Sequence, residues 1–149
     1  MEHHPALGEL TDCSGGRTFP HLCLEARPFV LSGLLRRATH KSILVTPNYD
    51  RVLQWQAKLQ LCGIPESQIL ILPSGQSTLF EDSLPESVAL SDRVGALRFL
   101  ASPGPGIVLT TPPAALERTL PVDILTESFV ELRTGDTLDE AALTRTLFR

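Results

Sequence analysis

Residues 42–48 read Ser-Ile-Leu-Val-Thr-Pro-Asn, and this short stretch decides the fold. Its apolar run contains β-branched residues and ends at a Pro-Asn pair, which is typical of a strand buried in a parallel sheet. Residues 49–61 then have a helical pattern, with Asn48 as a candidate N-cap and Gly63 just beyond the end. The stretch therefore predicts a buried strand that leads directly into a capped helix.

The same pattern occurs again further along the chain. Residues 69–72 (Ile-Leu-Ile-Leu) and 106–110 (Gly-Ile-Val-Leu-Thr) predict two more strands, and residues 87–100 predict the helix between them. Residues 112–120 predict a short helix with proline near its start. Strands that alternate with helices of about ten residues favour a parallel sheet covered on both faces, so we predict an α/β fold with these strands as parallel neighbours.

Apolar spacing also predicts which helix residues face the sheet. The residues expected to point inward are Tyr49, Val52, Leu53 and Leu59 on the first helix, and Val88, Val94, Leu97 and Leu100 on the second. A further helix, from about Pro28 to Thr39, precedes the first strand.

We divide the chain into three parts. Residues 1–20 contain prolines and a Ser-Gly-Gly cluster and predict an irregular lead-in. Residues 21–128 form the α/β domain. Residues 129–149, with a short strand at 129–132 and then a helix that opens on a capping box, predict the incomplete start of a second domain. Because the last helix reaches the final residue without a cap, we expect a truncated chain.

Bulk composition narrows the class of protein. The chain has 149 residues, of which 42% are hydrophobic and 20% charged, as expected of a soluble globular domain. A net charge of −4 gives no whole-chain basic signal for nucleic acid. No apolar run approaches the roughly 18 residues that a membrane span needs. Three scattered cysteines fit a reduced, cytoplasmic chain, and the close pair His21 and Cys23 lacks the further ligands of a structural zinc site.

A nucleotide phosphate would lie at the N-terminus of the helix before residue 42. A P-loop requires G-x-x-x-x-G-K-[ST] at that position, and residues 21–28 read His-Leu-Cys-Leu-Glu-Ala-Arg-Pro instead. No other motif for nucleophilic, metal or dinucleotide chemistry occurs in the sequence.

The required features of a P-loop fail in this segment for chemical reasons. His21 and Ala26 replace the two glycines and obstruct the close approach of the backbone to phosphate. Arg27 keeps a positive charge at the lysine position, but Glu25 puts a negative charge where phosphate would lie. Pro28 removes both the hydroxyl that would bind magnesium and one backbone N–H. Whether the segment is an ordinary loop or a decayed P-loop, it predicts no ATP binding.

Several stretches, in order and spacing, resemble the N-terminal module of the transcription-repair coupling factor (Mfd) family, a module that is similar to the excision-repair helicase UvrB. They are residues 43–48; residues 72–100, with Phe80, Glu81, Pro85, Ser91 and Arg93; residues 106–116; and residues 132–143. Residues 75–80 depart from the family because its aromatic tryptophan is missing there. The match also ends before the hairpin region that contacts UvrA in the family.

The resemblance implies a degenerate P-loop, helicase-like fold similar to domain 1a of UvrB. It implies a non-catalytic module of a DNA repair factor whose parent is an ATP-dependent DNA translocase that displaces stalled RNA polymerase and recruits UvrA. ATP and magnesium would belong to the parent's motor, with no cofactor in this fragment, and UvrA binding by the fragment would be weak or absent.

Helicase-like modules present the loops after their strands to a nucleic-acid backbone. Thr46, Asn48, Thr110 and Thr111 lie at such strand ends, although their cap preference also suits a purely structural role. Two alternatives stay open: a divergent nucleotide-binding enzyme, and an unrelated autonomous α/β interaction domain.

Overall fold

The computed structural model describes residues 21–74, 86–119, 121–127, 134–135 and 139–147. Contacts divide the chain into two compact units, Met1–Glu117 and Arg118–Arg149. The lead-in at 1–20 and the strand predicted at 129–132 lie outside the described residues. The predicted second domain from residue 129 therefore stays a prediction.

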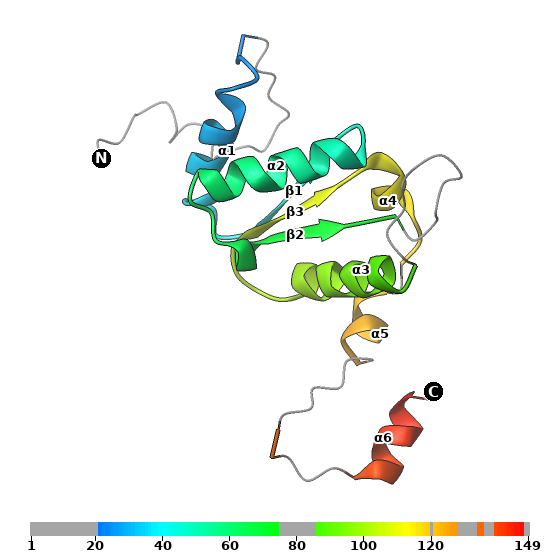
Figure 1. Cartoon of the computed structure of the whole chain (residues 1–149). Coiled ribbons are helices and arrows are strands. Elements are labelled where there is room, and N and C mark those ends of the chain that lie inside the picture. The colour runs from blue at the N-terminus through cyan, green and yellow to red at the C-terminus, as the bar shows by residue number, and fades with distance from the viewer. Residues whose placement is uncertain (1–20, 75–85, 120, 128–133, 136–138, 148–149) are drawn as a thin grey trace. The chain divides into compact units, whose positions relative to one another are not determined.

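The first unit is built on a parallel three-stranded sheet (Figure 1). Its strands are β1 (Lys41–Val45), β2 (Ile69–Leu72) and β3 (Gly106–Thr110), in the order β1-β3-β2. β3 is central and pairs in parallel with both neighbours, so that Leu109 lies between Leu44 and Ile71. The predicted parallel α/β fold is confirmed at this level.

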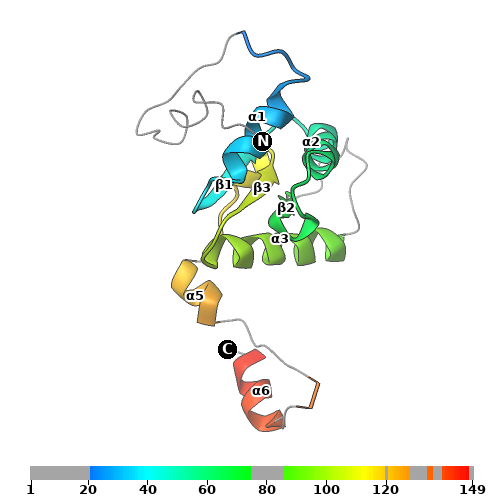
Figure 2. The ribbon, with the colours of Figure 1, turned by 90° about the vertical axis from the view of Figure 1, so that its left-hand side faces the viewer.

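Helices cover both faces of the sheet, as predicted. α1 (Arg27–Leu35) and α2 (Tyr49–Leu61) lie on one face and α3 (Glu86–Ala101) lies on the other (Figures 1 and 2). α2 has the predicted bounds because Asn48 caps it, with Oδ1 accepting from the backbone N–H of Arg51 at 3.0 Å.

Alternation along the strands produces two apolar layers. On the α1 and α2 face, a core cluster contains Leu35, Val52, Leu59, Ile64, Ile69, Ile107 and Leu109. On the α3 face, Leu72, Ala96 and Val108 are buried, with Leu70, Leu97, Phe99 and Leu100 packed against them. Neighbouring residues of β2 and β3 thus point to opposite layers, as the period of a strand requires.

Three of the predicted inward residues are exposed instead. Leu53, Val88 and Val94 keep 43%, 43% and 38% of their surface accessible. On α2, Val52 and Leu59 define the buried stripe, and residue 53 is turned about 100° away from residue 52. On α3, apolar residues occur on every side of the helix, so their spacing alone does not select the buried face, which centres on Arg93 and Ala96.

The remaining elements are short. A single 3-10 turn (Glu66–Gln68) leads into β2, and α1 ends at Leu35 rather than at Thr39. α4 (Pro112–Leu116) ends earlier than the predicted 112–120. The second unit contains α5 (Val122–Glu127), which the sequence did not predict, and α6 (Glu140–Leu147), which begins at the last residue of the predicted capping box, residues 137–140. Among the described residues, no helix has both the length and the apolar character needed to cross a membrane.

Candidate functional site at the carboxyl edge of the sheet

In open parallel sheets, ligands bind beyond the carboxyl ends of the strands, so this edge is the first place to look for a site. The predicted contact residues Thr46, Asn48, Thr110 and Thr111 do meet here. The ends of β1 and β3 are joined by a hydrogen bond from Thr46 N to the Thr110 carbonyl, at 2.8 Å. The structure therefore brings these residues together at one edge.

Their polar groups are nevertheless engaged within the fold. The Thr46 hydroxyl donates to the Asn48 carbonyl at 3.1 Å, and the Thr110 hydroxyl donates to the Leu72 carbonyl at 3.0 Å. Thr46 and Thr110 are only 3% and 0% exposed, and the Asn48 side chain caps α2. Their hydrogen bonds hold the edge together, which is the structural role that their cap preference suggested.

Thr111 differs from its neighbours because it is half-buried and stands at the N-cap of α4 without a side-chain cap bond. Pro112 and Pro113 follow it and have no N–H, so this helix start offers few backbone donors to an anion. α4 is also only 5 residues long. The end of β3 is thus poorly equipped to bind phosphate.

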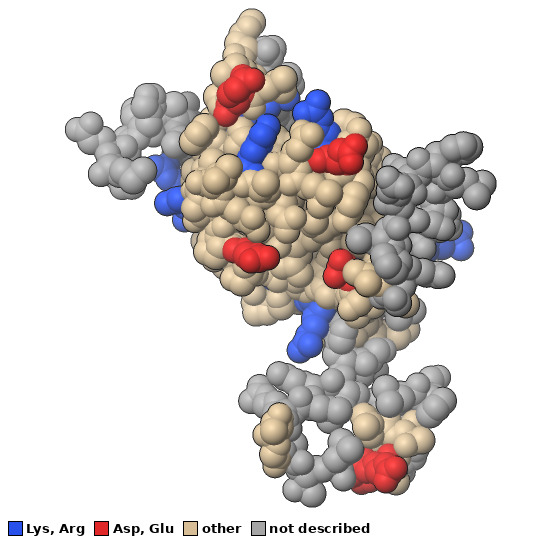
Figure 3. All heavy atoms as spheres, in the orientation of Figure 1, with Lys and Arg blue, Asp and Glu red and all other residues tan. Residues whose placement is uncertain are grey.

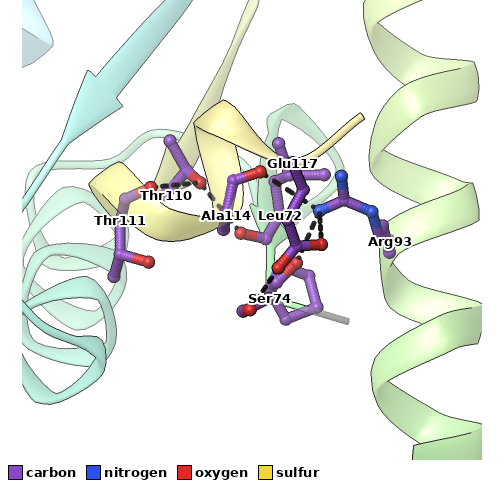
Figure 4. A network of polar contacts seen from close by, with 8 residues as sticks. Leu72, Ser74, Arg93, Thr110, Thr111, Ala114 and Glu117 are labelled. Atoms are coloured by element: carbon purple, nitrogen blue, oxygen red, sulfur yellow. Dashed lines mark hydrogen bonds and ion pairs between the residues drawn. The ribbon is translucent and has the colours of Figure 1, made fainter. Parts of the chain in front are cut away.

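A buried arginine dominates the same edge (Figure 4). Arg93 Nη1 donates to the Pro73 carbonyl at 3.0 Å and to the Ala114 carbonyl at 3.2 Å, and it pairs with Glu117 Oε2 at 3.2 Å. The Ser74 hydroxyl donates to the other carboxylate oxygen of Glu117. One guanidinium therefore links α3 to the segment after β2 and to α4.

This network gives Nη1 of the buried Arg93 an ionic partner and two hydrogen-bond acceptors, which lowers the free-energy cost of burying its charge. Arg93 is 7% exposed, and a buried charge requires an ionic partner and hydrogen bonds. Its Nη2 is buried and has no hydrogen-bond partner among the residues that the structure describes. Arg93 belongs to one of the sequence motifs above, but the motif does not predict this network. The available signal was an arginine three and four residues before Ala96 and Leu97, which places the three residues on the same side of α3.

The segment aligned with a P-loop forms an exposed turn that leads into α1. His21, Glu25 and Arg27 are exposed, and Ala26 occupies the N-cap without a side-chain cap bond. Arg27 Nε donates at 3.3 Å to a backbone carbonyl of the same turn. Pro28 is buried in the first turn of the helix and lacks an N–H. This turn therefore has neither the glycines nor the hydroxyl of a P-loop.

One titratable group near the sheet edge is perturbed. Burial raises the pKa of the Tyr49 phenol above its usual value, and the negative charge of Asp92 raises it further. Tyr49 is therefore neutral near pH 7 and is unsuited to act as a general base there.

The charged side chains and the possible metal ligands of the described residues form no cluster that indicates a second site. On the face shown in Figure 3, acidic and basic side chains are scattered among one another, without a continuous basic stripe. Within the described ranges, no group of three or more His, Cys, Asp and Glu side chains is placed to hold a metal ion.

Comparison with known proteins adds no relative: no family model, no curated protein and no solved structure matches the chain.

Proposed function

We propose that this chain is the non-catalytic N-terminal module of a transcription-coupled DNA repair factor, with a degenerate, helicase-like fold similar to domain 1a of UvrB. The parent protein would displace stalled RNA polymerase with an ATP-driven motor acting on DNA, and would recruit UvrA. This module would belong to the recruitment end and would act through protein contacts.

The observation that carries the proposal is the environment of Arg93. This residue belongs to one of the stretches that resemble the coupling-factor family, residues 72–100. Its guanidinium binds the carbonyl of Pro73, in the same stretch, and that of Ala114, in the stretch 106–116. Motif residues far apart in sequence thus cooperate in one buried contact, which is expected if they are the signature of a common fold.

The non-catalytic part of the proposal has separate support. The hydroxyls of Thr46 and Thr110 are buried and bonded to backbone carbonyls, so they are not available to a substrate. In the exposed turn before α1, Glu25 puts a negative charge where phosphate would lie. Pro28 lacks the hydroxyl that would bind magnesium. Tight binding of a nucleotide would need donors that these residues do not provide.

Two other functions compete with this one. A divergent nucleotide-binding enzyme would use Arg27 as its phosphate ligand, and a thermal-shift assay with ATP and magnesium distinguishes it from the proposed module. An unrelated interaction domain would share the fold but would have no connection with the excision-repair proteins.

Binding to UvrA tests the proposal itself. We would titrate UvrA calorimetrically with this chain, and in parallel with a full-length coupling factor that contains it. We expect the full-length protein to bind and this chain to bind weakly or not at all, because interface affinity is concentrated in a few residues and the family's lie mainly beyond the matched segment. Equal affinity of the two proteins for UvrA would place the recruitment surface within residues 1–149. If neither protein bound UvrA, the proposed role would be wrong.

A further inference from the structure

The backbone groups on the outer edge of β1 are unpaired among the residues that the structure describes. In the part of the chain that the structure describes, β1 pairs with β3 alone. Thr46 N bonds to β3, and successive residues of a strand direct their backbone groups to opposite sides. Lys41, Ile43 and Val45 therefore direct their N–H and C=O groups away from β3, toward the open edge.

The same residues carry an uncovered apolar row. Ile43 and Val45 lie beside Val108 and Thr110 of β3, on the face that α3 covers elsewhere. α3 packs against β2, on the far side of β3, so Ile43 and Val45 are left 58% and 51% exposed. Outward-directed backbone groups and exposed β-branched side chains are therefore found on the same short strand, β1.

The one charged residue of β1 does not protect this edge against pairing. Natural edge strands are often guarded by a lysine that points into the approach path. Lys41 is the single charged residue of β1, but its Nζ lies 4.6 Å from the centre of the Phe99 ring. It also donates to Ser102 Oγ at 3.0 Å and to the Pro103 carbonyl at 3.3 Å. The charge is tied to its own chain and leaves Ile43 and Val45 accessible.

We propose that β1 pairs with β1 of a second copy of this chain, in an antiparallel, two-fold symmetric arrangement centred on Ile43. In this register Ile43 faces Ile43 of the other copy, and Lys41 faces Val45. All of these residues direct their backbone groups outward, so each facing pair can exchange two N–H···O bonds. The contact is isologous, because the same surface is used on both copies.

A second β1 matches this edge in length, in outward-directed backbone groups and in exposed apolar side chains. A shift of one residue would set outward-directed backbone groups against inward-directed ones and would move the side chains to opposite faces. A shift of two would keep the pattern but lose facing pairs. The symmetric register is thus the one with full overlap, and it joins Ile43 and Val45 of both copies into one apolar row. The buried surface is small, so the dimer is weak and forms at high protein concentration.

The first test is sedimentation equilibrium of the 149-residue chain over a wide concentration range. We expect a reversible monomer–dimer equilibrium. Ile43→Lys should raise its dissociation constant by about tenfold or more, because two lysines would face each other across the symmetry axis. Leu61→Lys is the matched control, since Leu61 is an 88% exposed leucine at the end of α2; it should leave the constant unchanged. A chain that stays monomeric, or a dimer that Ile43→Lys does not weaken, overturns the proposal.

The second test identifies the occupant of the edge by residue-resolved amide exchange. The Ile43 and Val45 amides should become protected as the concentration rises, while the Leu44 amide, directed toward β3, is protected throughout. Protection of Ile43 and Val45 that does not depend on concentration would mean that a segment of the same chain covers the edge, and would refute the dimer. Their rapid exchange at every concentration would also refute it.

Discussion

Replacing Arg93 by alanine tests the structural role assigned to the sheet edge. The change removes two hydrogen bonds from a charged donor, at 3.0 and 3.2 Å, together with the ion pair to Glu117. Hydrogen bonds to charged groups contribute about 1.5–3 kcal/mol each, and breaking a buried ion pair from one side costs about 3–5 kcal/mol. These terms overlap, and Glu117 keeps 20% of its side chain in solvent, where water can partly replace the arginine.

We therefore expect Arg93→Ala to lower the free energy of unfolding by about 3–4 kcal/mol, in the lower part of the range for a buried pair. Glu117→Gln, which leaves both carbonyl bonds of Arg93 in place, should cost about 1–2 kcal/mol. Urea unfolding followed by circular dichroism measures both, and the double variant gives the coupling between them. A loss below about 1 kcal/mol for Arg93→Ala would show that the guanidinium is effectively solvated, and would refute the reasoning.

Other predictions concern the core and the titration of Tyr49. Leu59→Ala, at a fully buried position, should cost about 2–5 kcal/mol of stability, whereas Leu61→Ala, at an 88% exposed one, should cost less than about 0.5 kcal/mol; equal losses in urea unfolding would contradict the assigned core. Gly106 has φ of +151° and an added Cβ would meet the Gln68 carbonyl at 3.1 Å, so Gly106→Ala should destabilise by about 2 kcal/mol or more, and a neutral result would refute this packing. The raised pKa of Tyr49 contributes stability that is complete below the ordinary tyrosine pKa of about 10 and is lost as pH rises through the folded value. Tyr49→Phe should therefore lose less stability than the parent chain above about pH 10, and equal losses would contradict a raised pKa.

Local sequence signals predicted the framework of the fold well. The Pro-Asn pair after β1 places an N-cap at Asn48, and the helix begins at the next residue as expected. β2 and β3 are short apolar runs between helices, with every residue of β3 and both end residues of β2 buried, so their positions follow from composition and length. These features depend on neighbours in sequence, which a single chain reveals directly.

The buried face of α3 and the hydrogen bonds at the sheet edge could not be predicted, because they depend on packing between segments that are distant in sequence. The apolar residues of α3 surround the helix, and only the position of the sheet selects Ala96 over Val94 for burial. The role of Arg93 required the knowledge that the carbonyls of Pro73, after β2, and of Ala114, in α4, lie next to its guanidinium. The strand-end positions of Thr46 and Thr110 were predictable, but the backbone carbonyls that bind their hydroxyls were not.

Calorimetric titration with ATP and magnesium tests most directly the central claim that this α/β module works without nucleotide chemistry. We predict no saturable heat, because Glu25, Ala26 and Pro28 remove the anion cradle and the magnesium ligand. Arg27→Ala should then change nothing in the titration. Saturable micromolar binding that is weakened by Arg27→Ala would contradict the account, since it would show that the turn before α1 still holds phosphate.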